Sequence, residues 1–253
     1  MSKESVFHLY GASLMLMHMA VYSSAQRSIT NYGLYHATMD DSYFSAPFIE
    51  AFGPLDDDKL KDIVKSSKEM SIEIIENGSK ASALVFMYSG CESCLMSVLK
   101  AIKEAQPSLF YKLLEEKTAS LGEFISKDIT TILDEKIDEY IDWLSRQSLL
   151  KKTRDIFRLL APSQIACQAL DFKFSEEVVR KIESMRNDCA HGRIGVSNLS
   201  DADQHVDYLI DLGEFFINLS ALSLNLPFSR HNRKAVLEEL FKNSPKERDK
   251  AKT

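Results

Sequence analysis

Three polar side chains stand close together near the end of one predicted helix: Arg186, Asn187 and His191, in the string RNDCAHG. Arginine stays charged and presents a fixed fork of donors that fits phosphate oxygens. Histidine titrates near neutral pH, so it can take up or release a proton. A histidine on a solvated helix face is usually inert, however, and an arginine near a helix C-terminus often only compensates the helix dipole. The chemistry therefore depends on how the helix positions the three side chains.

The helix that carries them is predicted to begin after Ser175, a suitable N-cap, and to end at Gly192, which suits a left-handed C-cap. Glu176 and Glu177 favour the positive end of the helix dipole. Apolar residues at helical spacing predict the side that faces the core. They are Val178, Ile182, Met185 and Cys189.

The three polar residues lie away from this apolar stripe. At 100° per residue, Arg186 is about 60° to its side, and Asn187 and His191 fall on the far face. Asn187 and His191 are four residues apart, within hydrogen-bonding reach of each other. We therefore expect the Asn187 side chain to fix the orientation of the His191 ring.

The string Arg-Asn-x-x-Ala-His-Gly at a helix end resembles the R-x4-6-H motif of the HEPN family of helical ribonucleases, which commonly carry a polar residue after the arginine. The match covers about eight residues closely. The resemblance implies a helical bundle that pairs as a homodimer, with two copies of the motif in one cleft. It also implies metal-independent cleavage of RNA by attack of the ribose 2′-hydroxyl. In this chain Arg186 and His191 would be catalytic, and Asn187 the accompanying polar residue.

The resemblance also bears on partners. Bacterial members of the family are often toxins or anti-phage effectors, and some are held in check by an antitoxin. RNA is thus the expected substrate, and a cognate antitoxin or regulatory protein a further partner. Arg186 and His191 lie about 140° apart around one helix, which makes it hard for them to converge on one phosphate. A two-fold partner would supply the missing groups, so we expect dimerisation and activity to be linked.

Positive charge is concentrated around the motif. The whole chain carries a formal charge of −6, yet residues 146–194 hold ten basic and six acidic residues, a net charge of +4. Such a region attracts an anionic ligand. The predicted substrate-binding residues are Lys151, Lys152, Arg154 and Arg193. The alternative interpretation is that these side chains merely solvate helix faces.

The composition predicts helices. Of 253 residues, 45% are hydrophobic and only 9 are glycine and 6 proline, and no long stretch alternates with period two. We expect an all-α multi-helix bundle of HEPN type. Its parts are an N-terminal helical segment packed on the bundle (1–55), the bundle (56–242) and a disordered charged tail (243–253). The predicted helices cover 6–22, 60–77 with Gly78 at its end, 80–105, 121–148, 149–160, 201–225 and 229–242.

Several classes of protein find no support in the sequence. Residues 6–22 form the most apolar run, but it is short for a membrane span and contains two histidines, so we expect a core helix. The four cysteines suggest reduced thiols in a cytoplasmic protein. Cys91 and Cys94 form a CxxC pair without further zinc ligands, and we expect both to be buried. Phosphate-binding glycine loops, dinucleotide fingerprints, HExxH and nucleophile elbows do not occur, and we expect no metal and no cofactor.

Two other functions remain open. The bundle could be a non-catalytic dimerisation or RNA-binding module, in which Arg186 forms a salt bridge and His191 closes the helix against Gly192. It could also be an antitoxin or adaptor that masks another enzyme, with the predicted helix 121–148 as the ligand of a groove. An exposed, solvent-lined cleft in which two His191 side chains face each other favours the enzyme. A buried or salt-bridged Arg186 favours the module.

Overall fold

The computed structural model describes residues 3–39, 45–46, 49–51, 53, 57–114, 128–161, 170–193 and 199–226. Its elements in chain order are α1 (Lys3–Met39), α3 (Asp57–Ala105), η1 (Pro107–Phe110), α4 (Tyr111–Leu114), α6 (Ile129–Ser145), α7 (Leu149–Leu160), α9 (Glu176–Ala190) and α10 (Ala202–Ser223). These residues contain no strand, so the predicted all-α class is confirmed.

Some predictions fall outside the described residues. They are the helix at 229–242, the tail at 243–253 and the boundary between the first two predicted parts of the chain at 55–56. The division into 1–55, 56–242 and 243–253 therefore stays a prediction.

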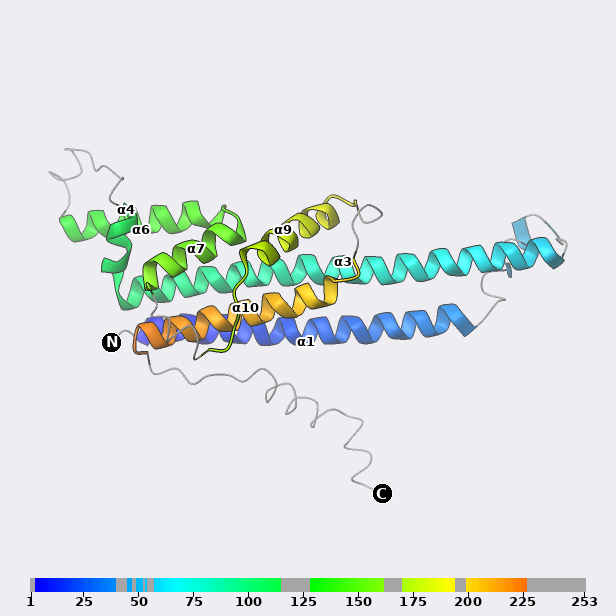
Figure 1. Ribbon diagram of the computed structural model, residues 1–253, viewed down its shortest axis with the longest axis horizontal. Helices are drawn as coiled ribbons and strands as arrows, with labels where there is room; N and C mark the ends of the chain where they lie inside the picture. Colours follow the sequence, from blue (N-terminus) through cyan, green and yellow to red (C-terminus); the bar gives the residue numbers. More distant parts are fainter. Residues whose placement is uncertain are drawn as a thin grey trace, which may run out of the picture.

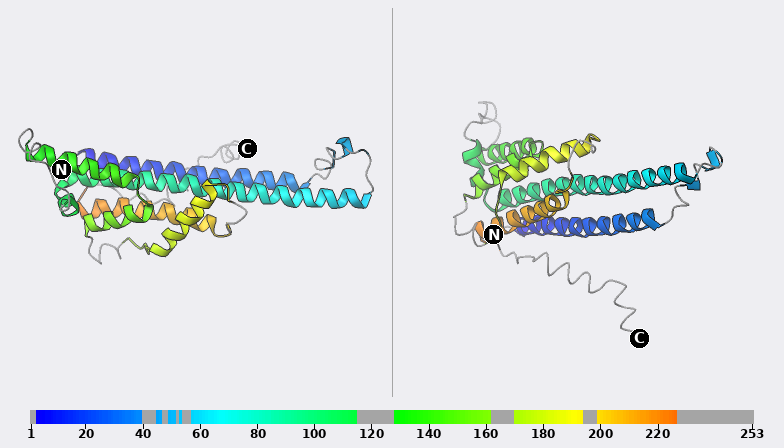
Figure 2. Two further views of the ribbon diagram at one scale, coloured as in Figure 1. Left: turned by 90° about the horizontal axis from the view of Figure 1, so that it is seen from above. Right: turned by 45° about the vertical axis from the view of Figure 1, so that its right-hand side comes forward.

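Helix α3 is the central element (Figure 1). α1 runs antiparallel beside it, and the side chains of Gln26 and Thr30 on α1 both contact the Ser79 hydroxyl of α3. α10 packs on α1 and α3, whereas α6, α7 and α9 lie on the side of α3 away from α1 (Figures 1 and 2). The far halves of α1 and α3 extend beyond α9 and α10 as a two-helix arm.

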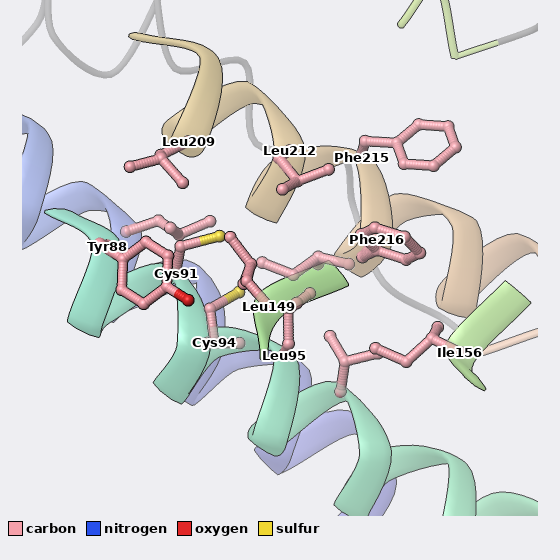
Figure 3. Packing of buried hydrophobic residues seen from close by; sticks show 14 of the residues in the cluster. Tyr88, Cys91, Cys94, Leu95, Leu149, Ile156, Leu209, Leu212, Phe215 and Phe216 are labelled. Carbon is pink, nitrogen blue, oxygen red and sulfur yellow. The ribbon is translucent and has the colours of Figure 1, made fainter. Parts of the chain in front are cut away.

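The core lies where α3 meets α1, α7 and α10. Cys91, Cys94 and Leu95 of α3 have no exposed surface, and Figure 3 shows them beside Leu149 of α7 and Phe216 of α10. Burial raises the pKa of both thiols well above the usual range, because a thiolate would lose its hydration there. The predicted burial of the CxxC pair is confirmed.

The predicted break in the second quarter of the chain is wrong. Two helices, 60–77 and 80–105, were expected on either side of Gly78, but α3 is continuous through this glycine. A glycine inside a helix costs only about 1 kcal/mol relative to alanine. Packing along α1, including the contact of Thr30 with Ser79, outweighs that cost.

The apolar run 6–22 lies within α1, as predicted for a core helix. Its buried side includes Leu9, Ala12, Leu16 and Met19. Within the described part of the chain, one helix, Asp58–Ala105, is long and apolar enough to cross a membrane. More than half of its most apolar stretch is buried inside the fold, and core helices have the same property.

Of the remaining helices, α7 and α10 match the predicted bounds closely, whereas α6 ends at Ser145, three residues before the predicted end. α6 begins at Ile129, because the carboxylate of Asp128 accepts a hydrogen bond from the backbone N–H of Thr131 at 2.9 Å. The first part of the predicted helix 121–148 lies outside the described residues. α7 coincides with the predicted 149–160, and α10 lies within the predicted 201–225.

Candidate functional site

The two ends of α9 are built as predicted. The Ser175 hydroxyl accepts a hydrogen bond from the backbone N–H of Val178 at 3.4 Å and caps the first turn. At the other end Gly192 has φ +70°, a conformation that favours glycine. The N–H of Arg193 then bonds to the carbonyl of Asp188 at 2.8 Å, which closes the helix in the manner of a left-handed C-cap.

The buried face of α9 differs from the predicted stripe at one position. Ile182, Met185 and Cys189 are buried as expected, but the buried valine is Val179, with Val178 only partly covered. This face packs on α3 and α7. It thereby brings the last turn of α9 against the middle of α3.

Arg186 points toward α3 at the edge of this contact. Its guanidinium carbon lies 5.0 Å from the centre of the Tyr88 ring, a distance at which the ring face attracts the cation. One terminal nitrogen donates a hydrogen bond to Asn187 Oδ1 at 3.0 Å, and Nε is buried without a hydrogen-bond partner among the described residues. No carboxylate pairs with Arg186 within the residues that the structure describes.

Tyr88 is itself held in place. Its hydroxyl donates to Glu183 Oε1 at 3.4 Å, and the same oxygen accepts the backbone N–H of Leu150, at the start of α7, at 3.1 Å. Burial, followed by the nearby carboxylates of Glu92 and Glu183, raises the pKa of Tyr88 above its usual range. The phenol therefore stays neutral, and its ring is a fixed support for Arg186.

The other two motif residues face solvent. Asn187 and His191 are both exposed, as the helix geometry predicted. The Asn187 side chain, however, bonds to Arg186. The backbone N–H of His191 donates to the carbonyls of Asn187, at 3.1 Å, and Cys189 at the end of the helix, and no side-chain hydrogen bond joins His191 to the described residues. In this arrangement Asn187 orients the arginine rather than the histidine, which differs from the prediction.

No protein-family model, curated protein or solved structure matches this chain. The resemblance of the motif to HEPN ribonucleases therefore rests on its residues and their geometry alone.

The prediction that Lys152 binds substrate is wrong for this fold. Its side chain is 1% exposed and its ammonium lies 2.6 Å from Glu92 Oε1 of α3, with the Gln147 carbonyl as a second acceptor. A cation so enclosed cannot reach a phosphate on the surface. Its position on α7 made it look solvated, but the helix turns this side toward α3.

The other three predicted substrate-binding residues are paired with acids. Lys151 lies 2.6 Å from the buried carboxylate of Asp155, and Arg154 donates from Nε to Glu176 at 2.7 Å. Arg193 is exposed and lies 3.7 Å from Asp188. Much of the positive charge around the motif is thus neutralised locally, which agrees with the alternative interpretation that these residues solvate helix faces.

Other candidate sites lie away from the motif. A cavity of about 200 Å³ is lined by Leu170, Asp171, Phe172, Asp211, Glu214, Phe215 and Asn218. It contains no residue of the last turn of α9. Among the described residues, no group of three or more His, Cys, Asp or Glu is placed to hold a metal ion.

Sequence reasoning missed Tyr88 and Glu183, the residues that position Arg186. Tyr88 lies far from the motif along the chain, and its neighbours carry no pattern that distinguishes it from a core aromatic residue. Glu183 is one turn before Arg186, and nothing in its local sequence distinguishes it from a solvated acidic residue. The contact between them joins residues 95 positions apart, so it appears only in the fold.

Proposed function

We propose that this chain is a metal-independent endoribonuclease, similar to the HEPN ribonucleases, with Arg186 and His191 in its active site. The observation that supports this proposal most is the set of contacts that the Arg186 guanidinium makes. Its guanidinium is held by the Tyr88 ring and the Asn187 amide, with no carboxylate partner in the described part of the chain. An exposed histidine stands in the next turn.

The contrast with nearby arginines gives this observation its weight. Arg154 and Arg180 both lie within salt-bridge distance of Glu176, and Arg158 lies near Asp155. A cation already paired with a carboxylate gains little from a phosphate, whereas Arg186 keeps its charge available. The stacked guanidinium is also oriented before any ligand arrives, which reduces the entropy lost on binding.

The proposed reaction is internal transesterification. The ribose 2′-oxygen loses its proton and forms a bond to phosphorus, while the bond from phosphorus to the 5′-oxygen breaks and that oxygen takes up a proton. One His191 accepts or supplies a proton, and the His191 of a second copy serves the other transfer. Arg186 stabilises the charge on the phosphate oxygens.

The biological role follows from the resemblance. A cytoplasmic ribonuclease of this kind would act as a toxin or an anti-phage effector, with RNA as substrate, a homodimer as the active form and an antitoxin as a regulator. It would need no cofactor. These properties are part of the proposal.

A second candidate function is a non-catalytic helical dimerisation or partner-binding module. The burial of Arg186 Nε on Tyr88 favours it, because arginines that only stabilise a helix contact are packed in this way. In that case His191 is an exposed residue at the end of α9 and has no catalytic role.

The deciding experiment is incubation of the full chain with total RNA in EDTA, followed by analysis of the new ends. We expect 2′,3′-cyclic phosphates. Arg186→Lys and His191→Ala should each lower the cleavage rate about 100-fold or more. Arg180→Ala is the matched control, because it removes an exposed arginine of the same helix that is paired with Glu176. Cleavage by both motif variants at the parent rate would exclude the mechanism.

A further inference from the structure

The outward side of α1 is apolar along most of the helix. Residues spaced by three or four positions line up on this side, and all are exposed. They are Phe7, Gly11, Leu14, His18, Val21, Ala25, Ile29 and Tyr32, and we call them the α1 seam. At 100° per residue the seam lies opposite the buried residues Leu9 and Leu16. Phe7 is 75% exposed, Leu14 50% and Ile29 66%.

The central part of the seam has no charged residue beside it. From Ser5 to Gln26, α1 contains no Asp, Glu, Lys or Arg. A helix on the surface of a single soluble molecule normally carries charged residues on its outer face, and a helix that is apolar all round is covered on every side. One side of α1 is covered by α3 and α10. This pattern favours a further element packed on the seam.

The side chains of the seam are complementary in size to those of the seam on a second copy of the chain. In an antiparallel pairing about a two-fold axis at the level of residue 16, six of the eight seam residues meet a seam residue of the partner. The facing pairs are Phe7 with Ala25, Gly11 with Val21 and Leu14 with His18. The two outer pairs set a large side chain against a small one, so the ridges of one helix enter the gaps of the other.

We propose that a second copy of this chain covers the α1 seam, with its own α1 packed antiparallel against the first. This inference goes beyond the proposed nuclease and does not rest on it. Figures 1 and 2 place α1 and α9 on opposite sides of α3, so the pairing leaves both α9 ends open.

The neighbouring surface of α3 continues the uncharged face. The rings of Tyr22 on α1 and Phe86 on α3 lie 4.2 Å apart between centres, and both are exposed. Beyond Phe86, the exposed Ser89 and Ser93 donate their hydroxyl protons to backbone carbonyls of the preceding turn, at 3.0 Å each. Their polarity is thus partly satisfied within α3, and their small size lets a partner approach closely.

A lipid bilayer fits the seam less well than a second copy. Helices that lie on anionic membranes carry lysines and arginines beside their apolar face, and α1 has none between Ser5 and Gln26. The next basic residue, Arg27, lies 3.1 Å from Asp203 of α10. Gly11 and Ala25 also leave gaps along the seam that a facing helix fills.

The first test is the mass of the full chain in solution, measured by sedimentation equilibrium or light scattering. We expect at least twice the 28.7 kDa of one chain. Leu14→Glu and Val21→Glu should each halve the mass of the parent assembly. Ile129→Glu is the matched control, because Ile129 is 64% exposed on α6, on the other side of α3. Its mass should stay that of the parent, and circular dichroism should show the same helix content in all variants.

The second test is the direction of pairing. Chains carrying Leu14→Cys are mixed with chains carrying His18→Cys under mild oxidation. The antiparallel pairing predicts a mixed disulfide several-fold more abundant than either like pair, whereas a parallel pairing predicts the like pairs. The inference is overturned by a monomeric parent chain, by a Leu14→Glu variant of unchanged mass, or by a monomer that sediments with phosphatidylcholine–phosphatidylserine vesicles.

Discussion

The guanidinium of Arg186 rests on the ring of Tyr88, which fixes the last turn of α9 to the middle of α3. If the proposed nuclease is correct, Tyr88 is a positioning residue, because it touches the arginine and not the substrate. We predict that Tyr88→Leu lowers the RNA cleavage rate about 10-fold, since the guanidinium loses its support. Tyr88→Phe keeps the ring and should stay within about three-fold of the parent.

The control for this prediction is the folded fraction. Both variants should show the parent's helix content at the assay temperature, because the rate is compared per folded molecule. Parent-like cleavage by Tyr88→Leu would mean that the ring has only a structural role.

The buried ion pair between Lys152 and Glu92 is predicted to matter for stability. Lys152→Met removes the cation and leaves a carboxylate that is 26% exposed beside the core. Loss of one partner of a buried pair typically costs several kcal/mol. Because Glu92 keeps some contact with water, we expect a loss of about 2–4 kcal/mol in the free energy of unfolding, measured by urea titration.

Arg154→Ala is the matched control for Lys152→Met. Arg154 and Glu176 are 44% and 42% exposed, and surface pairs of this kind contribute about 0–1 kcal/mol. Equal destabilisation by the two variants would contradict the structural role assigned to Lys152.

The caps of α9 and the burial of Lys152 show what the sequence could predict and what it could not. The caps of α9 at Ser175 and Gly192 depend on neighbouring residues, so local chemistry was enough to place them. The burial of Lys152 depends on Glu92, which is 60 positions away. Nothing near Lys152 distinguishes it from the solvated Arg154, because periodicity gives the face of a helix but not the element that packs on it.

The α1 seam and the α9 end lie on opposite sides of α3, and this arrangement links the two proposals. A nuclease site shared by two α9 ends requires a contact separate from the seam. Two different two-fold contacts on one chain build a tetramer when they close. If both proposals hold, the parent assembly has four times the mass of one chain. The Leu14→Glu assembly then has twice the mass of one chain, and this variant still cleaves RNA. If only the seam pairs, the parent is a dimer and the variant a monomer.

Alanine substitutions at two helical glycines are predicted to change the free energy of unfolding in opposite directions. Gly78 lies inside α3, and a Cβ added there meets no atom within 4 Å. Gly78→Ala should raise the free energy of unfolding by about 0.5–1 kcal/mol, because alanine loses less entropy in a helix. A Cβ on Gly213 of α10 would lie 2.7 Å from Leu16 Cδ1 of α1.

Gly213→Ala should therefore lower the free energy of unfolding by about 1–3 kcal/mol, because the buried Leu16 side chain must shift to admit the methyl group. Urea titration of both variants checks the pair. A stabilising Gly213→Ala would show that α10 and α1 are not in close contact at this point.

The buried His205 of α10 is predicted to make stability depend on pH. It is 6% exposed, and its Nδ1 has no hydrogen-bond partner in the part of the chain that the structure describes. Burial lowers its pKa, the charge of Lys181 lowers it further, and Asp201 opposes the shift. The unfolded chain therefore binds this proton more readily than the folded chain does. Above the ordinary histidine pKa of about 6.5, His205 is neutral in both states and does not make the free energy of unfolding depend on pH. As the pH falls below that value, the free energy of unfolding decreases until the pH passes the folded-state pKa of His205.

We expect the urea midpoint of the parent to be lower at about pH 5.5 than at about pH 7.5. His205→Gln removes the titrating group, so the difference between the two midpoints should become smaller. The carboxyl of Asp201 does not produce the same difference, because its pKa is lowered, chiefly by its hydrogen bond from Lys181, and its contribution is lost only in stronger acid. An unchanged difference in His205→Gln would assign the pH dependence to another group.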